Sequence, residues 1–295
     1  MEEGKALINL GELSKPATVL IEKISEAVGG VFRPYQIRRV ADAEADAEKI
    51  RAVSQIEVTD LQRRAMRRFL EEEAKKQQNI ENITNKALPK VGENSAPEKV
   101  ENDWLANFFE KCRLISDEEM QNLWAKVLAG EANSPGKFSK RTVSILSSLD
   151  KSDALLFENI CSFSWAIGDG VPLIFDEEDQ IYAKNKINYA VIKHLVEIGL
   201  ISHNGITGFK LNLHKKKAAM TYFSHRVLVE FPKEKDNELE LGNVLFSKAG
   251  QELGGICSSK PCDGFKDYVI NKWRGLGLKV FDGDAEISEY MNKNP

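Results

Sequence analysis

Apolar residues recur at helical spacing near the N-terminus of the chain. The stripe consists of Ala17, Leu20, Ile21, Ile24, Val28 and Val31. Such a repeat is typical of an amphipathic helix, and Ser14 and Pro16 suit the cap and first turn of a helix from Lys15 to Val28. We expect the apolar face to pack against the body of the protein or a neighbouring copy. Anchoring to a membrane surface is the less favoured interpretation.

The segment from Tyr35 to Leu88 contains neither glycine nor proline and is rich in Ala, Glu, Arg and Gln. As one helix it would reach about 80 Å, at roughly 1.5 Å per residue. That length indicates an arm or a coiled coil through which copies of the chain assemble. Thr59 and Gln62 have the spacing of a capping box, so a division into two helices near residue 59 is equally compatible with the pattern.

A change of composition follows this run. Pro89–Pro97 combines two prolines, a glycine and polar residues, which is typical of a linker. Beyond it, aromatic and aliphatic residues at helical spacing predict a helical bundle that extends to residue 166. Its expected features include a capping box at Ser116–Glu119, a capped helix after Ser139 and a last helix over Asp153–Trp165.

The last third of the chain has a different pattern. A helix is expected over Ile187–Ile198, followed by a turn, β-rich stretches, two short helices and a final strand over Leu278–Phe281. This order favours an α+β domain of winged-helix type. The fold class expected is therefore mainly α with a smaller α+β C-terminal part. The expected divisions are a helical oligomerisation arm (1–88), a linker (89–97), a helical bundle (98–166) and a winged-helix-like domain (167–295).

Composition narrows the functional classes only slightly. The 295 residues carry a net charge of −4, with 42% hydrophobic and 29% charged residues, so a general basic excess for nucleic-acid binding is lacking. The start of the chain, Met1-Glu2-Glu3, is not that of a signal peptide. The four cysteines form no CxxC pair, and we expect a cytoplasmic protein with reduced thiols.

Common catalytic signatures are missing from the sequence. It contains no GxxxxGK[ST], GxGxxG, HExxH or GxSxG motif. One pair of cysteines, Cys257 and Cys262, has a spacing seen in half of a zinc site. Completing that site would require histidines supplied by the fold, such as His225, with His203 and His214 as the other candidates. An ordinary loop with two thiols, and no cofactor, is the preferred interpretation.

Two basic clusters are candidates for contact with nucleic acid. One lies at a turn between predicted strands and consists of Lys210, His214, Lys215, Lys216 and Lys217. In a winged helix, such a turn contacts the phosphate backbone. The other lies in the Gly- and Pro-free run and consists of Arg63, Arg64, Arg67 and Arg68. Carboxylates flank these arginines, so a solvated, self-paired helix face is the preferred interpretation there.

Several segments resemble a known family. The most distinctive is LWAKVLAGE at Leu123–Glu131, which continues into PGKFSKRT at Pro135–Thr142. Leu13–Pro16, Glu72–Gln77 and Phe246–Leu253 are also similar. Together these segments resemble an uncharacterised, prophage-associated bacterial family with a central domain of unknown function. The resemblance implies a role in conflict with phage and assigns no catalytic residues.

Three functional hypotheses follow from these observations. The first is a self-assembling anti-phage defence protein, a sensor or effector that oligomerises through its N-terminal helices and contacts itself, a phage protein or nucleic acid. The second is a winged-helix nucleic-acid-binding regulator. The third is a nuclease, acting on RNA or DNA, that assembly activates, with or without zinc. A partner at the membrane surface is not expected.

Overall fold

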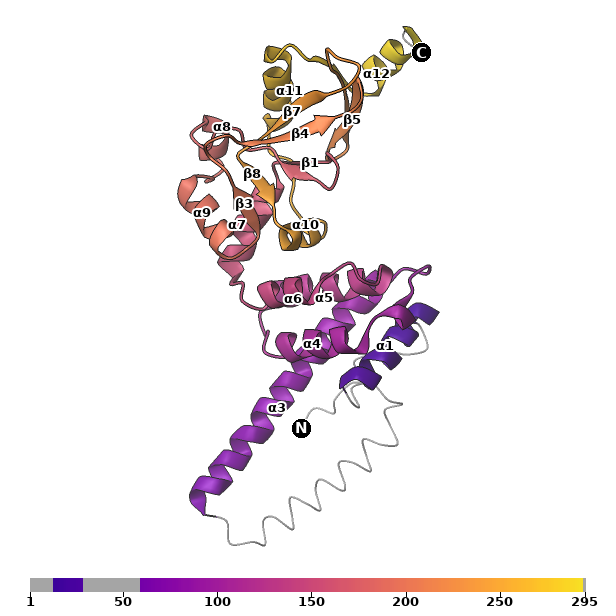
Figure 1. Ribbon diagram of the computed structural model, residues 1–295. Helices are drawn as coiled ribbons and strands as arrows, with labels where there is room; N and C mark the ends of the chain where they lie inside the picture. The colour runs from indigo at the N-terminus through magenta and orange to yellow at the C-terminus, as the bar shows by residue number, and fades with distance from the viewer. Residues whose placement is uncertain (1–12, 29–58, 294–295) are drawn as a thin grey trace. The chain divides into compact units, whose positions relative to one another are not determined.

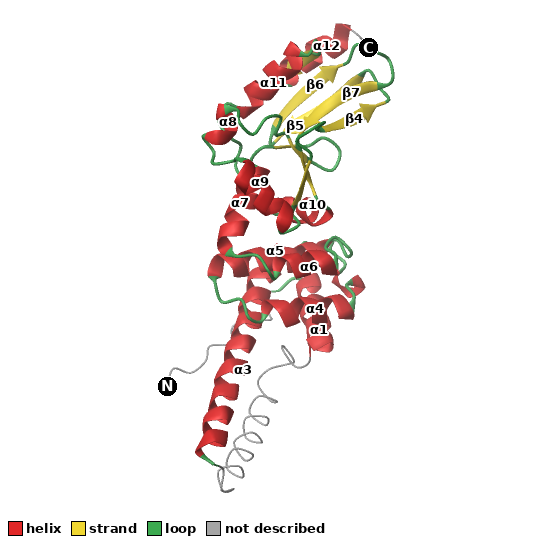
Figure 2. Ribbon diagram, turned by 60° about the vertical axis from the view of Figure 1, so that its left-hand side comes forward, coloured by secondary structure: helices red, strands yellow, loops and turns green. Residues whose placement is uncertain are grey.

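The computed structural model describes residues 13–28 and 59–293 of the chain. It divides the chain into two units, Met1–Ser147 and Ser148–Pro295. Helices form the first unit, whereas the second combines helices with short antiparallel strands (Figures 1 and 2). The prediction of a mainly α protein with a smaller sheet-containing C-terminal part is confirmed. The units divide earlier than expected, because the helix Lys151–Cys161 belongs to the second unit and not to the first.

The first unit contains five α-helices and two 3-10 turns among the described residues. They are α1 (Lys15–Val28), α3 (Asp60–Ala87), η2 (Leu88–Lys90), η3 (Pro97–Lys99), α4 (Asn102–Cys112), α5 (Glu118–Asn133) and α6 (Lys140–Leu146). Of the predicted stripe, Ala17, Leu20, Ile21 and Ile24 are buried and Val28 is half-buried, whereas Val31 lies outside the described residues. Helix α1 packs against α4 and η3, so its apolar face covers the body of the same unit.

Helix α3 begins where its sequence predicts a cap. Thr59 has an extended backbone, its side chain accepts a hydrogen bond from the Gln62 amide, and the Gln62 side chain accepts one from the Thr59 amide. The Gly- and Pro-free run is therefore not one uninterrupted helix, because Thr59 breaks it. Residues 35–58 of the expected arm lie outside the described residues. The second half of α3 packs on α5, with Ile83 and Ala87 buried.

The proline-rich segment after α3 lies within the first unit. The Ala96 amide donates to the Ala132 carbonyl at 3.2 Å. The Asn133 side chain accepts from the Gly92 amide at 2.8 Å and donates to the Lys90 carbonyl at 2.9 Å. These bonds fasten residues 89–97 to the end of α5, so the segment connects packed helices of one unit.

Aromatic side chains and one buried carboxylate organise the bundle. Phe108 lies with its ring centroid 5.1 Å from those of Trp104 and Trp124, and all three are buried. Glu131, at the end of the LWAKVLAGE segment, is also buried. Its two carboxylate oxygens accept the amides of Gly136 and Phe138 at 2.6 and 2.9 Å. Glu131 thereby closes the turn between α5 and α6, which explains a carboxylate at a buried position.

The second unit consists of short helices and short strands. They are α7 (Lys151–Cys161), β1 (Ser164–Trp165), β2 (Val171–Pro172), α8 (Gln180–Ala183), α9 (Tyr189–Glu197), β3 (Ile201–His203), β4 (Phe209–Leu213), β5 (Lys217–Tyr222), β6 (His225–Glu230), β7 (Asn237–Gly242), β8 (Val244–Phe246), α10 (Lys248–Gly254), α11 (Phe265–Gly275), β9 (Lys279–Asp282) and α12 (Asp284–Lys293). All strand pairs are antiparallel: β1 with β2, β3 with β8, β4 with β7, and β6 with both β5 and β9.

One face of the β5–β6–β9 sheet is filled by aromatic side chains. Tyr222 stacks on Trp165 with 5.2 Å between ring centroids, and Trp165 contacts Trp273 of α11 at 5.0 Å. The Tyr222 hydroxyl donates to the Ser162 carbonyl and accepts the Cys262 amide, both at 2.7 Å. This buried cluster joins the end of α7, the sheet and α11 into one core.

A close approach of two backbones tests the packing of α10. A Cβ atom on Gly250 would lie 2.0 Å from the Leu200 carbonyl oxygen. Because backbone atoms supply this clash, we expect Gly250→Ala to lower the free energy of unfolding of the second unit by roughly 1–3 kcal/mol. Urea unfolding followed by tryptophan fluorescence measures the change. Gly275→Ala is the matched control, since a Cβ there meets nothing within 4 Å. Equal stability of the two variants would contradict the packing.

Candidate functional site

The predicted basic turn lies where β4 ends and β5 begins. Lys210 is on β4, Lys217 opens β5, and His214, Lys215 and Lys216 lie in or beside the connection. His214–Lys217 therefore lie at the β4–β5 connection, whereas Lys210, the second residue of β4, lies nearer the other end of that strand. What the structure adds is a set of acidic neighbours from β7 and from the loop that precedes it.

Two lysines and one histidine of this basic cluster each contact a carboxylate. The Lys216 ammonium donates to Glu234 at 2.7 Å and that of Lys210 donates to Glu238 at 3.0 Å. His214 Nδ1 lies 3.3 Å from an oxygen of Asp236. Hydrogen bonds to these carboxylates raise the pKa values of Lys210 and Lys216. The turn is thus largely neutralised by its own surroundings, which weakens it as a phosphate-binding surface.

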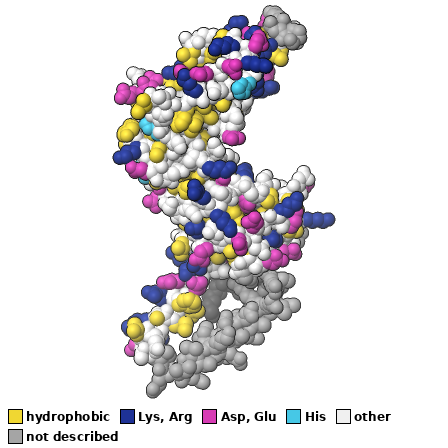
Figure 3. Space-filling view, in the orientation of Figure 1, with side chains coloured by type: hydrophobic (Ala, Val, Ile, Leu, Met, Phe, Trp, Pro, Cys, Tyr) yellow, Lys and Arg dark blue, Asp and Glu magenta, His cyan; other side chains and the backbone are white. Residues whose placement is uncertain are grey.

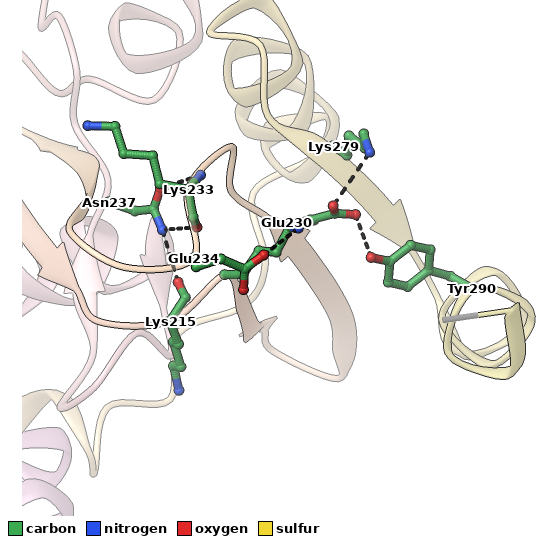
Figure 4. Close-up of polar contacts among 8 residues, drawn as sticks. Lys215, Glu230, Lys233, Glu234, Asn237, Lys279 and Tyr290 are labelled. Carbon is green, nitrogen blue, oxygen red and sulfur yellow. Dashed lines mark hydrogen bonds and ion pairs between the residues drawn. The ribbon is translucent and has the colours of Figure 1, made fainter. Parts of the chain in front are cut away.

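A buried amide fixes the shape of this turn (Figure 4). Asn237 is buried at the start of β7. Its Nδ2 donates to the carbonyls of Lys215 at 3.1 Å and Lys233 at 2.8 Å. Its Oδ1 accepts the Lys233 amide at 3.2 Å. Asn237 therefore holds the basic turn and the acidic loop together, and Lys215 contributes a backbone carbonyl to this arrangement.

A second polar cluster lies beside the turn, around Glu230 at the end of β6 (Figure 4). Glu230 is largely buried. Its carboxylate accepts the hydroxyl of Tyr290 from α12, and the Lys279 ammonium of β9 lies 3.5 Å away. The Lys217 ammonium lies 4.8 Å from the centre of the Tyr290 ring. Residues from β5, β6, β9 and α12 thus meet at one point.

The electrostatics of the cluster follow from these contacts. The hydrogen bond from Tyr290 and the charge of Lys279 hold the pKa of Glu230 below its ordinary value, although burial acts in the opposite direction. The same hydrogen bond, together with burial, raises the pKa of Tyr290 to about 12. Glu230 is therefore an anion, and Tyr290 a neutral donor, over the physiological pH range.

Sequence reasoning missed both Tyr290 and Glu230. Residues 282–286 carry three carboxylates around a glycine in the sequence, a pattern typical of a turn, whereas α12 begins at Asp284. The helix has no continuous apolar stripe, and only Ile287 and Tyr290 are half-buried. A weakly amphipathic segment of this kind gives almost no periodic signal. Glu230 closes β6 after the apolar run Val227–Val229, and nothing local marks the tyrosine that binds it.

The predicted zinc ligands lie in different surroundings. The Cys257 thiol contacts Cys161 of α7, and this hydrogen bond together with burial raises the pKa of Cys161. Cys262 Sγ instead accepts the Asn185 side chain at 3.3 Å. His225 is an exposed residue at the start of β6. Within residues 13–28 and 59–293, no group of three or more His, Cys, Asp or Glu side chains is placed to hold a metal ion.

The predicted arginine cluster lies on the first half of α3. Arg63 contacts Asp60 at 3.0 Å, Arg67 contacts Glu71 at 2.9 Å and Arg68 contacts Glu72 at 3.5 Å. Arg64 lies on the same exposed stretch of helix. These pairs agree with the interpretation of a solvated face that neutralises itself. Exposed pairs of this type contribute little to stability.

One family model matches this chain. It covers residues 63–270 and is described as a protein of unknown function, DUF2806. The chain belongs to this family. The matched range begins in α3 and ends in α11, so α1, β9 and α12 of this DUF2806 protein lie outside it. No curated protein and no solved structure matches the chain. Among the helices that the structure describes, none is long and apolar enough to cross a membrane.

The Glu230 cluster predicts a pH-dependent effect of Tyr290→Phe. Losing a hydrogen bond to a carboxylate should lower the free energy of unfolding by roughly 1–2 kcal/mol near neutral pH. The folded-state pKa of Glu230 is depressed, so its contribution is present above its unfolded pKa and is lost as the pH falls through the folded value. The difference between variant and wild type should therefore shrink towards about pH 3.5 in urea unfolding.

Tyr189→Phe provides the control for this experiment, because Tyr189 is an exposed tyrosine of the same unit. It should unfold like the wild type at both pH values. A Tyr290→Phe effect that is the same at acidic and neutral pH would contradict the assignment to Glu230.

Proposed function

We propose that this DUF2806 protein self-assembles through the first half of α3 and acts in the cytoplasm as a bacterial anti-phage defence protein, as a sensor or effector. One observation supports the assembly above all others. Four large apolar side chains lie exposed within ten residues of α3, where a folded protein normally avoids a cluster of this kind. Figure 3 shows hydrophobic and charged side chains side by side on this helix.

The exposure of these side chains is substantial. Leu61 is 69% exposed, Phe69 57%, Met66 48% and Leu70 47%. At about 100° per residue they occupy roughly half of the helix circumference, and the arginines lie mostly on the other half. The later part of the helix behaves differently, because Ile83 is completely buried there. Helix α3 therefore belongs to the bundle at one end and presents, at the other, an exposed apolar face that no other described element covers.

Charge favours a second copy of the chain as the occupant of this face. Basic residues concentrate in Arg63–Arg68 and acidic residues in Glu71–Glu73. Two copies of α3 packed antiparallel about a two-fold axis near Phe69 would place each basic block at the level of the acidic block of the other copy. A symmetric contact of this type is self-complementary, and the apolar half-circumference would be covered at the same time.

The defence role rests on the resemblance to a prophage-associated family, and self-assembly is a property that a sensor or effector of infection can use. A second candidate function is a winged-helix regulator, favoured by α9, which is followed by the paired strands β3 and β8. The carboxylates around Lys210 and Lys216 argue against its wing. An assembly-activated nuclease with zinc ranks last, because Cys257 and Cys262 contact different neighbours.

Replacing the apolar contacts tests the assembly. Leu61→Glu combined with Phe69→Glu should abolish association, because paired carboxylates cannot be buried between two helices without cost. Mass photometry and light scattering of the full-length protein should show an assembly for the wild type and a monomer of 33.1 kDa for the variant. Ile206→Glu is the control, because Ile206 is an exposed apolar residue at the turn between β3 and β4. A wild type that is monomeric at all accessible concentrations would refute the proposal.

The defence role needs its own experiment. Expression of the wild type in a bacterial host should reduce plaque formation by susceptible phages, and the Leu61→Glu/Phe69→Glu variant should lose this protection while Ile206→Glu retains it. If a monomeric variant still protects the host, the defence role does not require self-assembly, and the proposed connection between the two is wrong.

A further inference from the structure

The outer face of the β5–β6–β9 sheet carries one cation on each strand. Side chains alternate between the two faces of a strand, and directly opposite residues share a face. Lys217 pairs with Glu230, Glu230 pairs with Lys279, and Thr221 pairs with Arg226. Lys217, Arg226 and Lys279 therefore lie on one face, opposite the face that carries the buried Tyr222.

Helix α12 occupies this outer face. The Tyr290 ring stacks on Phe281 of β9, with 4.0 Å between the ring centroids and 25° between the planes. The same ring lies beneath the Lys217 ammonium. An oxygen of Asp284 lies 3.6 Å from the Arg226 guanidinium. Helix α12 therefore contacts the sheet through the Tyr290 ring, which stacks on Phe281, and through the Asp284 carboxylate, which lies beside Arg226.

Helix α12 buries few apolar side chains against the sheet. None of its described side chains is fully buried, and the Arg226–Asp284 pair is exposed, at 64% and 77% for the two side chains. An element with few buried apolar contacts opens at a low free-energy cost. The family match also ends before this helix, at residue 270. Release of α12 would leave the aromatic cluster around Tyr222 and Trp273 in place, because it lies on the inner face.

We propose that the outer face of the β5–β6–β9 sheet binds single-stranded nucleic acid, and that α12 occupies the site until it is displaced. Tyr290 takes the position of a base stacked on Phe281, and Asp284 takes that of a phosphate at Arg226. Three cations, Lys217, Arg226 and Lys279, against one carboxylate, Glu230, leave a charge of +2 on the face once α12 has moved. A basic sheet with an aromatic platform is the usual chemistry for stacked bases and phosphates.

A protein helix fits this face less well than nucleic acid does. Helices that bind grooves insert a row of apolar anchors. Only Ile287 and Tyr290 of α12 are half-buried, so the face offers such anchors little room. The cations and the flat Phe281 ring instead match groups that every nucleotide carries. This inference does not depend on α3 or on self-assembly, and the test below leaves α3 unchanged.

Fluorescence anisotropy with the full-length protein tests the site. The probe is a fluorescein-labelled single strand of about twelve nucleotides of mixed sequence, as RNA and as DNA, at about 50 mM salt. Asp284→Ala combined with Tyr290→Ala should release α12 and strengthen binding roughly tenfold over the wild type, because the competent state is then more populated. Adding Arg226→Glu should remove this gain. Adding Lys260→Glu, at an exposed lysine of another loop, should leave it intact.

Other outcomes would overturn the proposal. The first is that the Asp284→Ala/Tyr290→Ala variant binds the single strand no more tightly than the wild type does. The second is that Arg226→Glu and Lys260→Glu change the affinity equally. The third is that the protein binds duplex as tightly as single strand. Binding of a peptide with the α12 sequence (284–293), without binding of either oligonucleotide, would reassign the face to a protein partner.

A measurement on the wild type covers the case in which the released variant does not fold. A saturating oligonucleotide should speed amide hydrogen exchange in α12 while exchange in β5 and β6 slows. Unchanged exchange in α12 at saturation would contradict displacement.

Discussion

Burial of aromatic side chains on the inner face of the β5–β6–β9 sheet is the constraint on which the second unit depends. Tyr222 is both packed and hydrogen-bonded there, with its hydroxyl shared between Ser162 and Cys262. A buried tyrosine needs such partners, and they connect the end of α7 and the loop before α11 to one strand. Because this face is committed to the core, any ligand of the sheet would have to bind its outer face. That is where α12 lies.

The first unit follows the same principle with helices. The second half of α3 is buried against α5, and the polar pair Asn79 and Gln121 is satisfied inside that contact, with 3.3 Å between the two amides. The first half of α3 has no such neighbour among the described residues, and its apolar side chains face solvent. A helix can be long because one end is stabilised by packing, while its other end is kept helical by the Thr59 cap and by ion pairs. Both proposed binding surfaces therefore consist of residues that lie outside the two hydrophobic cores.

The distribution of charge differs between the sequence and the folded surface. The run His214–Lys217 is strongly basic in sequence, yet Glu234, Asp236 and Glu238 lie beside it in the fold. The outer sheet face instead combines Lys217, the last residue of that run, with Arg226 and Lys279, which belong to no basic run. Counting charges along the sequence therefore overestimates the turn as a binding surface and overlooks the sheet. The field that a ligand meets depends on which strands are neighbours.

Local features of this protein could be predicted from sequence alone. The stripe of α1, the Thr59 capping box, the cap at Ser139 and the strand near Phe281 depend on residues within a few positions of one another, so periodicity and capping chemistry reveal them. The pairing of β3 with β8, the contact of Cys257 with Cys161 and the bond from Tyr290 to Glu230 join distant segments. Only the tertiary structure decides them, because packing and satisfied polar groups select those partners, and no local pattern encodes which surface remains uncovered.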